Sequence, residues 1–280
     1  MNIGGSPLAT QETMPENNQA SSAVYFLEEP LKRLVFALQD YSLLAFQSVL
    51  NVVTPPAYWG DTIEQMDSIG VGSLWIVALT ALFIGAVLVL QTGAEFERFG
   101  EKAFTGTAVS LALVRELGPV ITALLVAGRN ASGIASELGS MVVTEQVDAM
   151  RALGTNPLRK LVTPRVVAMV LTLPLLVAVA DFVGLIGAFA YAYYALGMGY
   201  VQFWTRAVDA LEFGDLVQGF FKPLVFGFII STVACQKGLR VRGGTQGVGK
   251  ATTSAVVISS VLILVLDFFL GRVFLHIFQR

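Results

Sequence analysis

The chain has 280 residues, of which 55% are hydrophobic and only 14% are charged, and its mean hydropathy is +0.69. Because soluble globular proteins carry roughly 25% charged residues, this composition indicates an integral membrane protein with little room for a soluble domain. The net charge of −2 gives no general electrostatic preference for nucleic acid, so no nucleic-acid partner is expected.

The N-terminal region is polar at first and then amphipathic. Residues 1–22 contain neither a basic n-region nor an apolar h-region, so they predict a disordered tail and not a secretory signal. Residues 23–68 are interpreted as an interfacial helix and a connector. Apolar positions recur at helical spacing in Val24–Val53, but charges interrupt them, which suits a helix lying in the membrane interface. A soluble helix packed against the rest of the chain is the alternative.

The remainder, residues 69–280, predicts a domain of five membrane-spanning helices. Each candidate has about 20 or more mostly apolar or small residues, enough to cross a hydrocarbon core of about 30 Å. The expected spans are Ile69–Gln91, Phe104–Gly128, Pro164–Gly197, Leu216–Cys235 and Thr252–Ile277. The expected fold class is therefore an all-α integral membrane protein, with five transmembrane helices preceded by an N-terminal interfacial amphipathic helix.

The basic residues of the connections predict the orientation. Most of them follow the second and fourth spans, between residues 129 and 165 and between residues 237 and 250. The opposite side has only Arg98, Lys102 and Arg206. Because short cytoplasmic loops are enriched in Lys and Arg, the N-terminus is expected in the cytoplasm and the C-terminus outside.

Ionisable residues inside the spans are the first candidate site. A charge at mid-bilayer costs about 2.5–3.5 kcal/mol or more, so each needs a partner or water. At a rise of about 1.5 Å per residue, five of them lie at a similar depth. These are Arg115, Glu116, Asp181, Lys222 and Asp267. The first two are neighbours pointing about 100° apart, so their partners are expected on different helices.

Two interpretations of these charges stay open. They form a buried network that fixes helix packing, or a polar patch at the base of an outward-open cavity that meets a polar headgroup. We expect Arg115, Glu116, Lys222 and Asp267 to act as one network.

The connection after the second span contains the second candidate site. Glu145–Gly154 predicts a short helix with Val147, Met150 and Leu153 along one side, which Gly154 terminates and Pro157 prevents from continuing. An apolar ridge of this kind, with flanking charges, suits a groove on a partner domain.

One motif suggests nucleotide binding but does not support it. Gly244–Ala251 nearly matches the phosphate loop G-x-x-x-x-G-K-[ST], but Ala251 has no hydroxyl for Mg²⁺ and no strand precedes the motif. The run is interpreted as a flexible, tightly turned loop before the last span. With one cysteine, Cys235, and one histidine, His276, neither a catalytic site nor a metal site is expected.

Several separated motifs, taken in order, resemble the MlaE/YrbE permeases, the membrane subunits of MCE-type ABC lipid transporters. The resemblance covers roughly Ile69 to the end. The motifs are Leu113–Val120, Ala127–Arg129, Thr144–Leu158, Pro164-Arg165, Gly247–Thr253 and Leu266–Phe268.

The resemblance implies a bacterial inner-membrane protein that works with other chains. These would be a second copy of itself, a cytoplasmic ABC ATPase dimer that binds ATP and Mg²⁺, and a periplasmic oligomer of MCE proteins. It implies no cofactor on this chain and an outward-facing cavity that holds phospholipid between the two permeases.

The resemblance also assigns roles to residues. It places acyl-chain contacts at Leu88, Phe96 and Phe99 near the outer end of the first span. It makes Arg115, Glu116, Lys222 and Asp267 substrate-binding residues. It makes the helix near residues 144–154 the coupling element, with Glu145, Asp148, Met150 and Gly154 as its ATPase-coupling residues.

Two other functions are compatible with the residues alone. An ion- or proton-coupled secondary transporter could use the membrane carboxylates as a relay, but the odd number of spans and the lack of an internal repeat count against it. A structural membrane anchor for a periplasmic complex is the third possibility.

Overall fold

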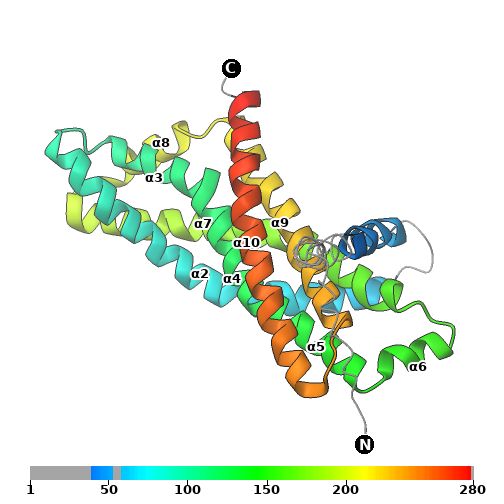
Figure 1. Cartoon of the computed structure of the whole chain (residues 1–280). Coiled ribbons are helices and arrows are strands. Elements are labelled where there is room, and N and C mark those ends of the chain that lie inside the picture. The colour runs from blue at the N-terminus through cyan, green and yellow to red at the C-terminus, as the bar shows by residue number, and fades with distance from the viewer. Residues whose placement is uncertain (1–38, 53–57, 279–280) are drawn as a thin grey trace, which may run out of the picture. The chain divides into compact units, whose positions relative to one another are not determined.

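The computed structural model describes residues 39–52 and 58–278, which are largely helical and contain no strand within those ranges (Figure 1). Five helical segments are long and apolar enough to cross a membrane, which confirms the predicted number. They are Trp59–Arg98, Phe104–Val143, Leu158–Leu196, Phe213–Leu239 and Gly244–Phe278. The account below concerns the described residues from Leu44 onward, which belong to one compact unit.

The N-terminal predictions are tested only in part. The predicted tail, residues 1–22, lies outside the described residues, as does most of the expected interfacial helix. Residues 39–52 are helical, in agreement with the expected helix of Val24–Val53. Its position in the membrane interface stays a prediction.

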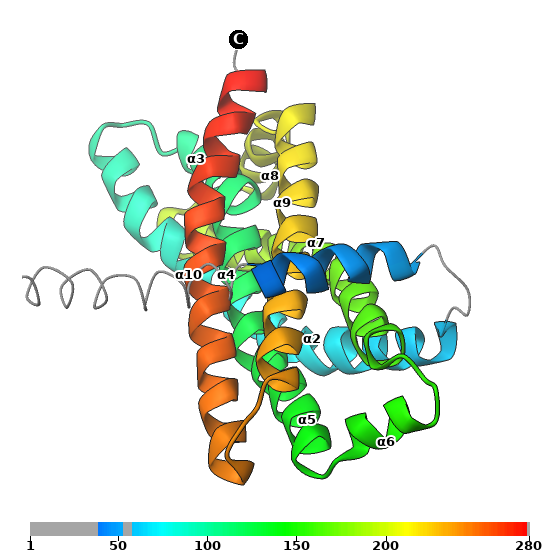
Figure 2. The same ribbon diagram turned by 45° about the vertical axis from the view of Figure 1, so that its right-hand side comes forward.

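Helices α2 (Trp59–Arg98) and α7 (Thr163–Leu196) run side by side in the same direction (Figures 1 and 2). Their backbones come so close that a Cβ at Gly85 would overlap the Gly184 carbonyl oxygen, and one at Gly187 would overlap that of Leu82. Small residues permit such approach between membrane helices, where dispersion replaces the hydrophobic effect as the main attraction.

The second span was predicted to end at Gly128, but it continues to Val143. It consists of α3 (Phe104–Ala112), the π-turn η1 (Leu113–Leu117), α4 (Gly118–Val126), the π-turn η2 (Ala127–Ala131) and α5 (Ser132–Val143).

The polar residues that suggested a loop after Gly128 make bonds to another helix. Arg129 and Asn130 both donate hydrogen bonds to the Ser73 hydroxyl on α2, at 3.0 and 2.9 Å. The helix can therefore continue through η2 without leaving these side chains unpaired. Similarly, the π-turn η3 (Leu158–Val162) extends the third span before Pro164, which occupies the second position of α7.

Four further helices complete the chain. They are α6 (Gln146–Ala152), α8 (Tyr200–Asp209), α9 (Phe213–Leu239) and α10 (Gly244–Phe278). The short helix α8 was not predicted. The interpretation of Gly244–Ala251 as a loop is wrong, because this run forms the first turns of α10. The chain turns at Gly243 and Gly244, whose φ angles are 89° and 67°.

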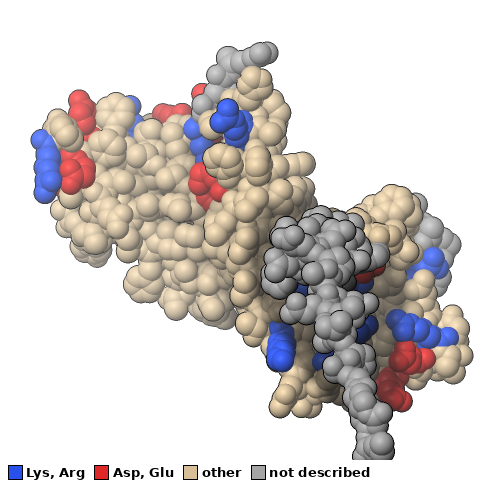
Figure 3. Space-filling view, in the orientation of Figure 1, with Lys and Arg blue, Asp and Glu red and all other residues tan. Residues whose placement is uncertain are grey.

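The connections gather at two ends. At one end, Lys102 donates to the Leu196 carbonyl (3.3 Å) and Thr107 to the Arg206 carbonyl (3.2 Å), which joins the connections after α2 and α7. At the other, the connection after α9 packs on α5 beside Gly139, close to α6. The two basic connections therefore share one end. Figure 3 shows charged side chains near the ends of the visible face and a broad uncharged band between them.

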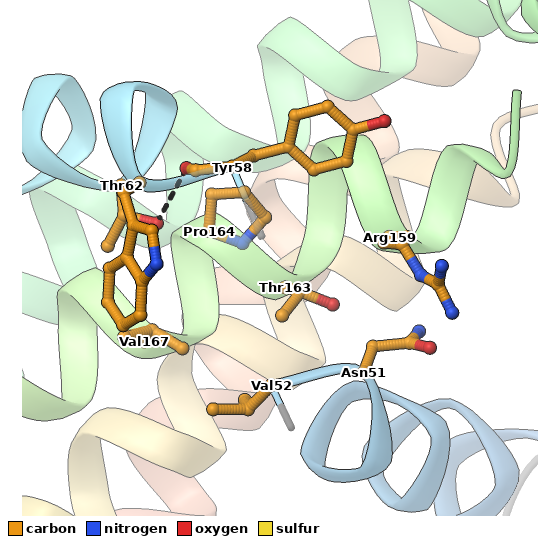
Figure 4. Close-up of a pocket in the computed structure, with 9 residues that line it drawn as sticks. Asn51, Val52, Tyr58, Thr62, Arg159, Thr163, Pro164 and Val167 are labelled. Carbon is orange, nitrogen blue, oxygen red and sulfur yellow. Dashed lines mark hydrogen bonds between the residues drawn. The ribbon is translucent and has the colours of Figure 1, made fainter. Parts of the chain in front are cut away.

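A small hollow lies where α2 begins, between residues 51–52 and the start of α7 (Figure 4). The Tyr58 carbonyl accepts a hydrogen bond from the Thr62 hydroxyl there, at 3.1 Å. Lys160 bonds Asp61 (2.5 Å) and lies over the Tyr58 ring. The hollow measures about 20 Å³, far below the roughly 300 Å³ of a small ligand pocket, so it holds no lipid.

Large apolar side chains of α10 remain exposed, although the helix packs on α9 and α5. Only 22% of its most apolar window is buried within the chain. The exposed side chains include Val257, Val261, Leu264, Val265, Phe268 and Phe269. In a bilayer, lipid or another protein has to cover this face.

Candidate functional site

The π-turn η1 positions the central charged pair. The Gly118 N–H bonds the Leu113 carbonyl five residues back, which widens the turn that contains Arg115 and Glu116. Pro119 follows and has no N–H, so the Arg115 carbonyl lacks its ordinary α-helical donor. Single π-turns inside α-helices occur often at functional sites.

Side chains of α9 supply what the helix backbone lacks. Lys222 Nζ donates to the Arg115 carbonyl at 3.0 Å, and Gln218 Nε2 donates to the same oxygen at 3.1 Å. Gln218 also reaches Glu116 Oε1 at 3.3 Å. Two side chains of α9 therefore replace the hydrogen bond that Pro119 cannot donate, and they connect the second and fourth spans.

Glu116, Lys222 and Asp267 form an ionic triad across three spans. Lys222 Nζ lies 2.6 Å from Glu116 Oε2 and 2.8 Å from Asp267 Oδ1. The Asp267 contact is close but lacks the alignment of a hydrogen bond. Side-chain exposure is 0% for Lys222, 19% for Asp267 and 47% for Glu116. The cation is thus enclosed, while the Glu116 side chain is partly exposed.

Arg115 has a different partner, which the sequence reasoning missed. Its Nε lies 2.5 Å from Asp215 Oδ1 and its second nitrogen 3.2 Å from Oδ2. Asp215 also caps α9 by accepting the Glu212 N–H at 3.0 Å. It was missed because it precedes Leu216, where the fourth span was expected to begin. The Glu-x-x-Asp spacing at the start of α9 is the signal that could have found it.

The structure therefore corrects the predicted pairing. Arg115 and Glu116 were expected to find partners on different helices, but both pair with α9, through Asp215 and Lys222. These two residues are seven positions apart, almost two full helical turns, so they project from the same face of α9 about 10 Å apart along its axis. Arg115 and Glu116 therefore pair with the same helix at two different positions along its axis. Asp267 on α10 joins only the second pair.

Asp181 does not join this network. Among the described residues it has no ion-pair partner, and its Oδ1 is buried without a hydrogen bond. That oxygen occupies the place where a side chain on Gly118 would project. Shared depth in the membrane therefore correctly grouped Glu116, Lys222 and Asp267, whereas Arg115 pairs with Asp215 and Asp181 stands apart.

The three residues assigned to acyl-chain contacts lie in different surroundings. Leu88 packs against the buried cluster around Val89 and Val109. Phe96 is half-buried near the end of α2, and Phe99 just beyond it is 79% exposed. Their contact with lipid stays a prediction.

The predicted coupling helix exists as α6, and its two ends are sharply defined. Gly154 has φ +77° and ends the helix as predicted, and Glu145 precedes it with φ +60°. A non-glycine residue in the left-handed region is uncommon and costs roughly 1 kcal/mol. Asp148 is exposed and pairs with Arg151 at 2.7 Å.

The apolar ridge of α6 is divided between two surroundings. Val147 is buried and Met150 is half-buried, and both pack on the core of this chain. Leu153 is 84% exposed. The surface available to a partner is therefore Leu153 with the charged side chains of α6.

No cluster of three or more His, Cys, Asp or Glu suitable for a metal occurs within residues 39–52 and 58–278.

Comparison with known proteins identifies relatives along nearly the whole chain. The family model of the permease MlaE matches residues 62–273. A probable ABC transporter permease protein of Rickettsia felis is 43% identical over 238 residues, covering 85% of this chain and 92% of that protein. A probable ABC transporter permease protein of Synechocystis is 41% identical, covering 86% and 90%. The chloroplast protein TRIGALACTOSYLDIACYLGLYCEROL 1 of Arabidopsis thaliana is 37% identical, covering 94% and 76%.

Proposed function

Since this chain belongs to the MlaE family of ABC transporter permeases, we propose that it moves phospholipid between a bacterial inner membrane and a periplasmic assembly of MCE proteins. ATP and Mg²⁺ bind a separate cytoplasmic ATPase, and this chain supplies the membrane path. The basic end with α6 faces the cytoplasm, so the N-terminus lies inside and the C-terminus lies in the periplasm.

The observation that carries this proposal is the exposure of Glu116. Its side chain is 47% exposed within a membrane span, although it is paired with an enclosed lysine. A pair that only fixed helix packing would gain from being enclosed on both sides, because lipid cannot solvate a carboxylate. A partly exposed acidic side chain at this depth is better explained by a polar compartment that admits a lipid headgroup.

A second copy of the chain would build that compartment. The exposed apolar face of α10 lies on the helix that contributes Asp267 to the triad. Closed two-fold symmetry uses the same face on both copies, so a second copy covering this face would bring a second triad to the same interface. Lys222 and Asp267 then orient Glu116, and Arg115 is held by Asp215 beside it.

The connection to the ATPase runs through α6. Its exposed residues Glu145, Asp148 and Leu153 lie at the basic end, and α5 joins α6 directly to η2 and the rest of the second span. A push on α6 would therefore reach the helix that contains Arg115 and Glu116. Met150 and Gly154 fix the position and the length of α6.

The proposal is tested by purifying the tagged chain from its own membranes together with whatever copurifies. We expect an ATPase in the complex, bound phospholipid detectable by mass spectrometry, and ATP-dependent transfer of fluorescent phospholipid in proteoliposomes. Glu116→Gln should lower transfer severalfold and leave the ATPase bound. Glu101→Gln, at an exposed residue outside the spans, is the control and should leave transfer unchanged. Flux driven by a proton gradient without an ATPase would overturn the proposal.

A further inference from the structure

A cavity of about 290 Å³ lies between α7 and α9, against η1. This volume is at the lower end of small-molecule pockets, which measure roughly 300–1,000 Å³. Besides Asp181, its lining residues are apolar or glycine: Val114, Pro174, Ala178, Leu216, Gly219 and Phe220.

Asp181 is the single ionisable group in this lining. It lies near the middle of the 34-residue helix α7, within a membrane span. Its Oδ1 is enclosed against Gly118 and has no hydrogen-bond partner. The other oxygen, Oδ2, is not enclosed in this way and bonds no described residue, so a partner for the carboxyl would reach Oδ2 from the cavity that Asp181 lines.

Within the part of the chain that the structure describes, no side chain donates a hydrogen bond to Asp181. The charged donors of η1 and α9 are engaged elsewhere, since Arg115 pairs with Asp215 and Lys222 pairs with Glu116 and Asp267. Gln218 bonds Arg115 and Glu116. A polar group left unpaired away from water is destabilising, so retention of this carboxyl calls for a ligand.

The lining also has an accessible side. Ala178 is exposed, and Leu216 and Phe220 are 55% and 56% exposed, although all three belong to spanning helices. Molecules that approach such a surface in a bilayer are lipids. Their acyl chains match the apolar walls of the cavity, and a hydrogen-bond donor matches the carboxyl.

We propose that this cavity is a lateral lipid-binding site, in which the Asp181 carboxyl accepts a hydrogen bond from an ammonium or hydroxyl group of the lipid. Gly118 makes the site possible, because any side chain there would displace the carboxyl. The site is separate from the triad of Glu116, Lys222 and Asp267. The lipid site requires only that the chain lies in a bilayer. The proposal of this site can therefore be wrong while the proposed transport function is right, and it can be right while the transport function is wrong.

The test uses the full chain with its copurifying partners in nanodiscs, with Phe220 replaced by photoreactive p-benzoylphenylalanine. Three dioleoyl lipids are compared at equal concentration: phosphatidylethanolamine, which has ammonium N–H donors, dioleoylglycerol, which has a hydroxyl donor, and phosphatidylcholine, whose headgroup has neither. Photolabelling is quantified by mass spectrometry. At least one of the two donor lipids should exceed phosphatidylcholine by about tenfold, as expected for one hydrogen bond to a carboxylate. Whether the ammonium or the hydroxyl lipid is preferred identifies the donor.

Two variants decide the outcome. Asp181→Leu should remove the preference among the lipids, and Ala178→Trp should fill the cavity and reduce labelling by all three. Leu175→Trp is the control, because Leu175 is 59% exposed on the same helix and does not line the cavity. Equal labelling by the three lipids in the unsubstituted Asp181 background, or labelling that neither variant changes, would overturn the proposal.

Discussion

Lys222 Nζ lies 2.6 Å from Glu116 Oε2, and the two side chains differ completely in exposure, at 0% and 47%. Lys222 is surrounded by acceptors, since the Arg115 carbonyl and Asp267 also contact its ammonium. The lysine therefore depends on three neighbours, and those neighbours depend on it. This mutual dependence gives the first prediction.

Lys222→Met leaves the carboxylates of Glu116 and Asp267, on two different membrane spans, without their cation. We expect the variant to lose about 3–5 kcal/mol of stability, the range seen when one partner of a buried ion pair is removed. Thermal unfolding in detergent micelles, followed by circular dichroism, measures the loss.

The matched control does not restore the lysine but makes all three members of the triad neutral. The triple variant Glu116→Gln, Lys222→Met, Asp267→Asn should recover most of that stability, because neutral amides cost less to bury than unpaired carboxylates. Lys250→Met, on an exposed lysine, should change nothing. A triple variant no more stable than Lys222→Met would show that the triad is not a unit.

Arg115 and Asp215 should show a measurable coupling energy. Their two-point contact is partly enclosed, with side-chain exposures of 27% and 8%. A double-mutant cycle with Arg115→Gln and Asp215→Asn should give about 1–3 kcal/mol of coupling. Asp215→Ala should cost about 1 kcal/mol more than Asp215→Asn, since it also removes the cap on the Glu212 N–H. Additive single effects would contradict the pairing.

The backbone angle of Glu145 predicts opposite outcomes for two substitutions. Glu145→Gly should be neutral or stabilising by up to about 1 kcal/mol, because glycine adopts a positive φ without strain. Glu145→Val should destabilise the start of α6, because a β-branched side chain disfavours that conformation. Hydrogen exchange of the α6 amides distinguishes the two. Equal protection in both variants would contradict the left-handed conformation.

The exposed charges of α6 predict an effect on the proposed ATPase partner. The double variant Glu145→Lys, Asp148→Lys should detach or uncouple the ATPase, while the membrane helices remain folded. Retention of the ATPase after affinity purification and ATP hydrolysis by the complex are the measurements. Asp209→Lys, an exposed charge reversal on α8 at the other end, is the control and should leave both unchanged. Full retention and activity in the double variant would exclude α6 as the coupling element.

The contact between α2 and α7 predicts two very different effects of glycine-to-alanine changes. Gly187→Ala places a methyl group where the Leu82 carbonyl lies, and backbone cannot yield as a side chain can, so the loss should reach about 3 kcal/mol. Gly128→Ala meets nothing within 4 Å and should be neutral or stabilising. The yield of monodisperse protein in size-exclusion chromatography compares them. Similar yields would contradict the close packing.

The membrane spans could be predicted from sequence because they depend on runs of apolar residues long enough for a bilayer. Gly154 could be predicted as a helix end because a positive φ favours glycine. The extension of the second span past Gly128 could not be predicted, because Arg129 and Asn130 are polar and their shared partner, Ser73, is 56 or more positions away.

The candidate site shows the same division. Arg115, Glu116, Lys222 and Asp267 were identifiable because a charge inside a span is costly wherever it occurs. Their pairing was not, because it depends on the widened turn η1 and on Asp215, which lies just outside the expected span. Asp181 looked equivalent to the others in depth. Asp181 differs from the other four residues in the direction of its side chain, which depends on the packing of α7 against Gly118.

The widened turn η1 has a consequence for changes in chain length. A π-turn accommodates one residue more than the α-helical turn it replaces, so at η1 this span behaves as a helix with a local insertion of one residue. Deleting one residue within Leu113–Leu117 would restore a regular turn and leave α3 and α4 facing their present neighbours. The same deletion within α4 would rotate everything after it by about 100°, turning α5 away from α9 and α10. The segment that carries Arg115 and Glu116 is thus one of the two π-turns of this span, with η2, where the loss of a residue lets the flanking helices keep their contacts.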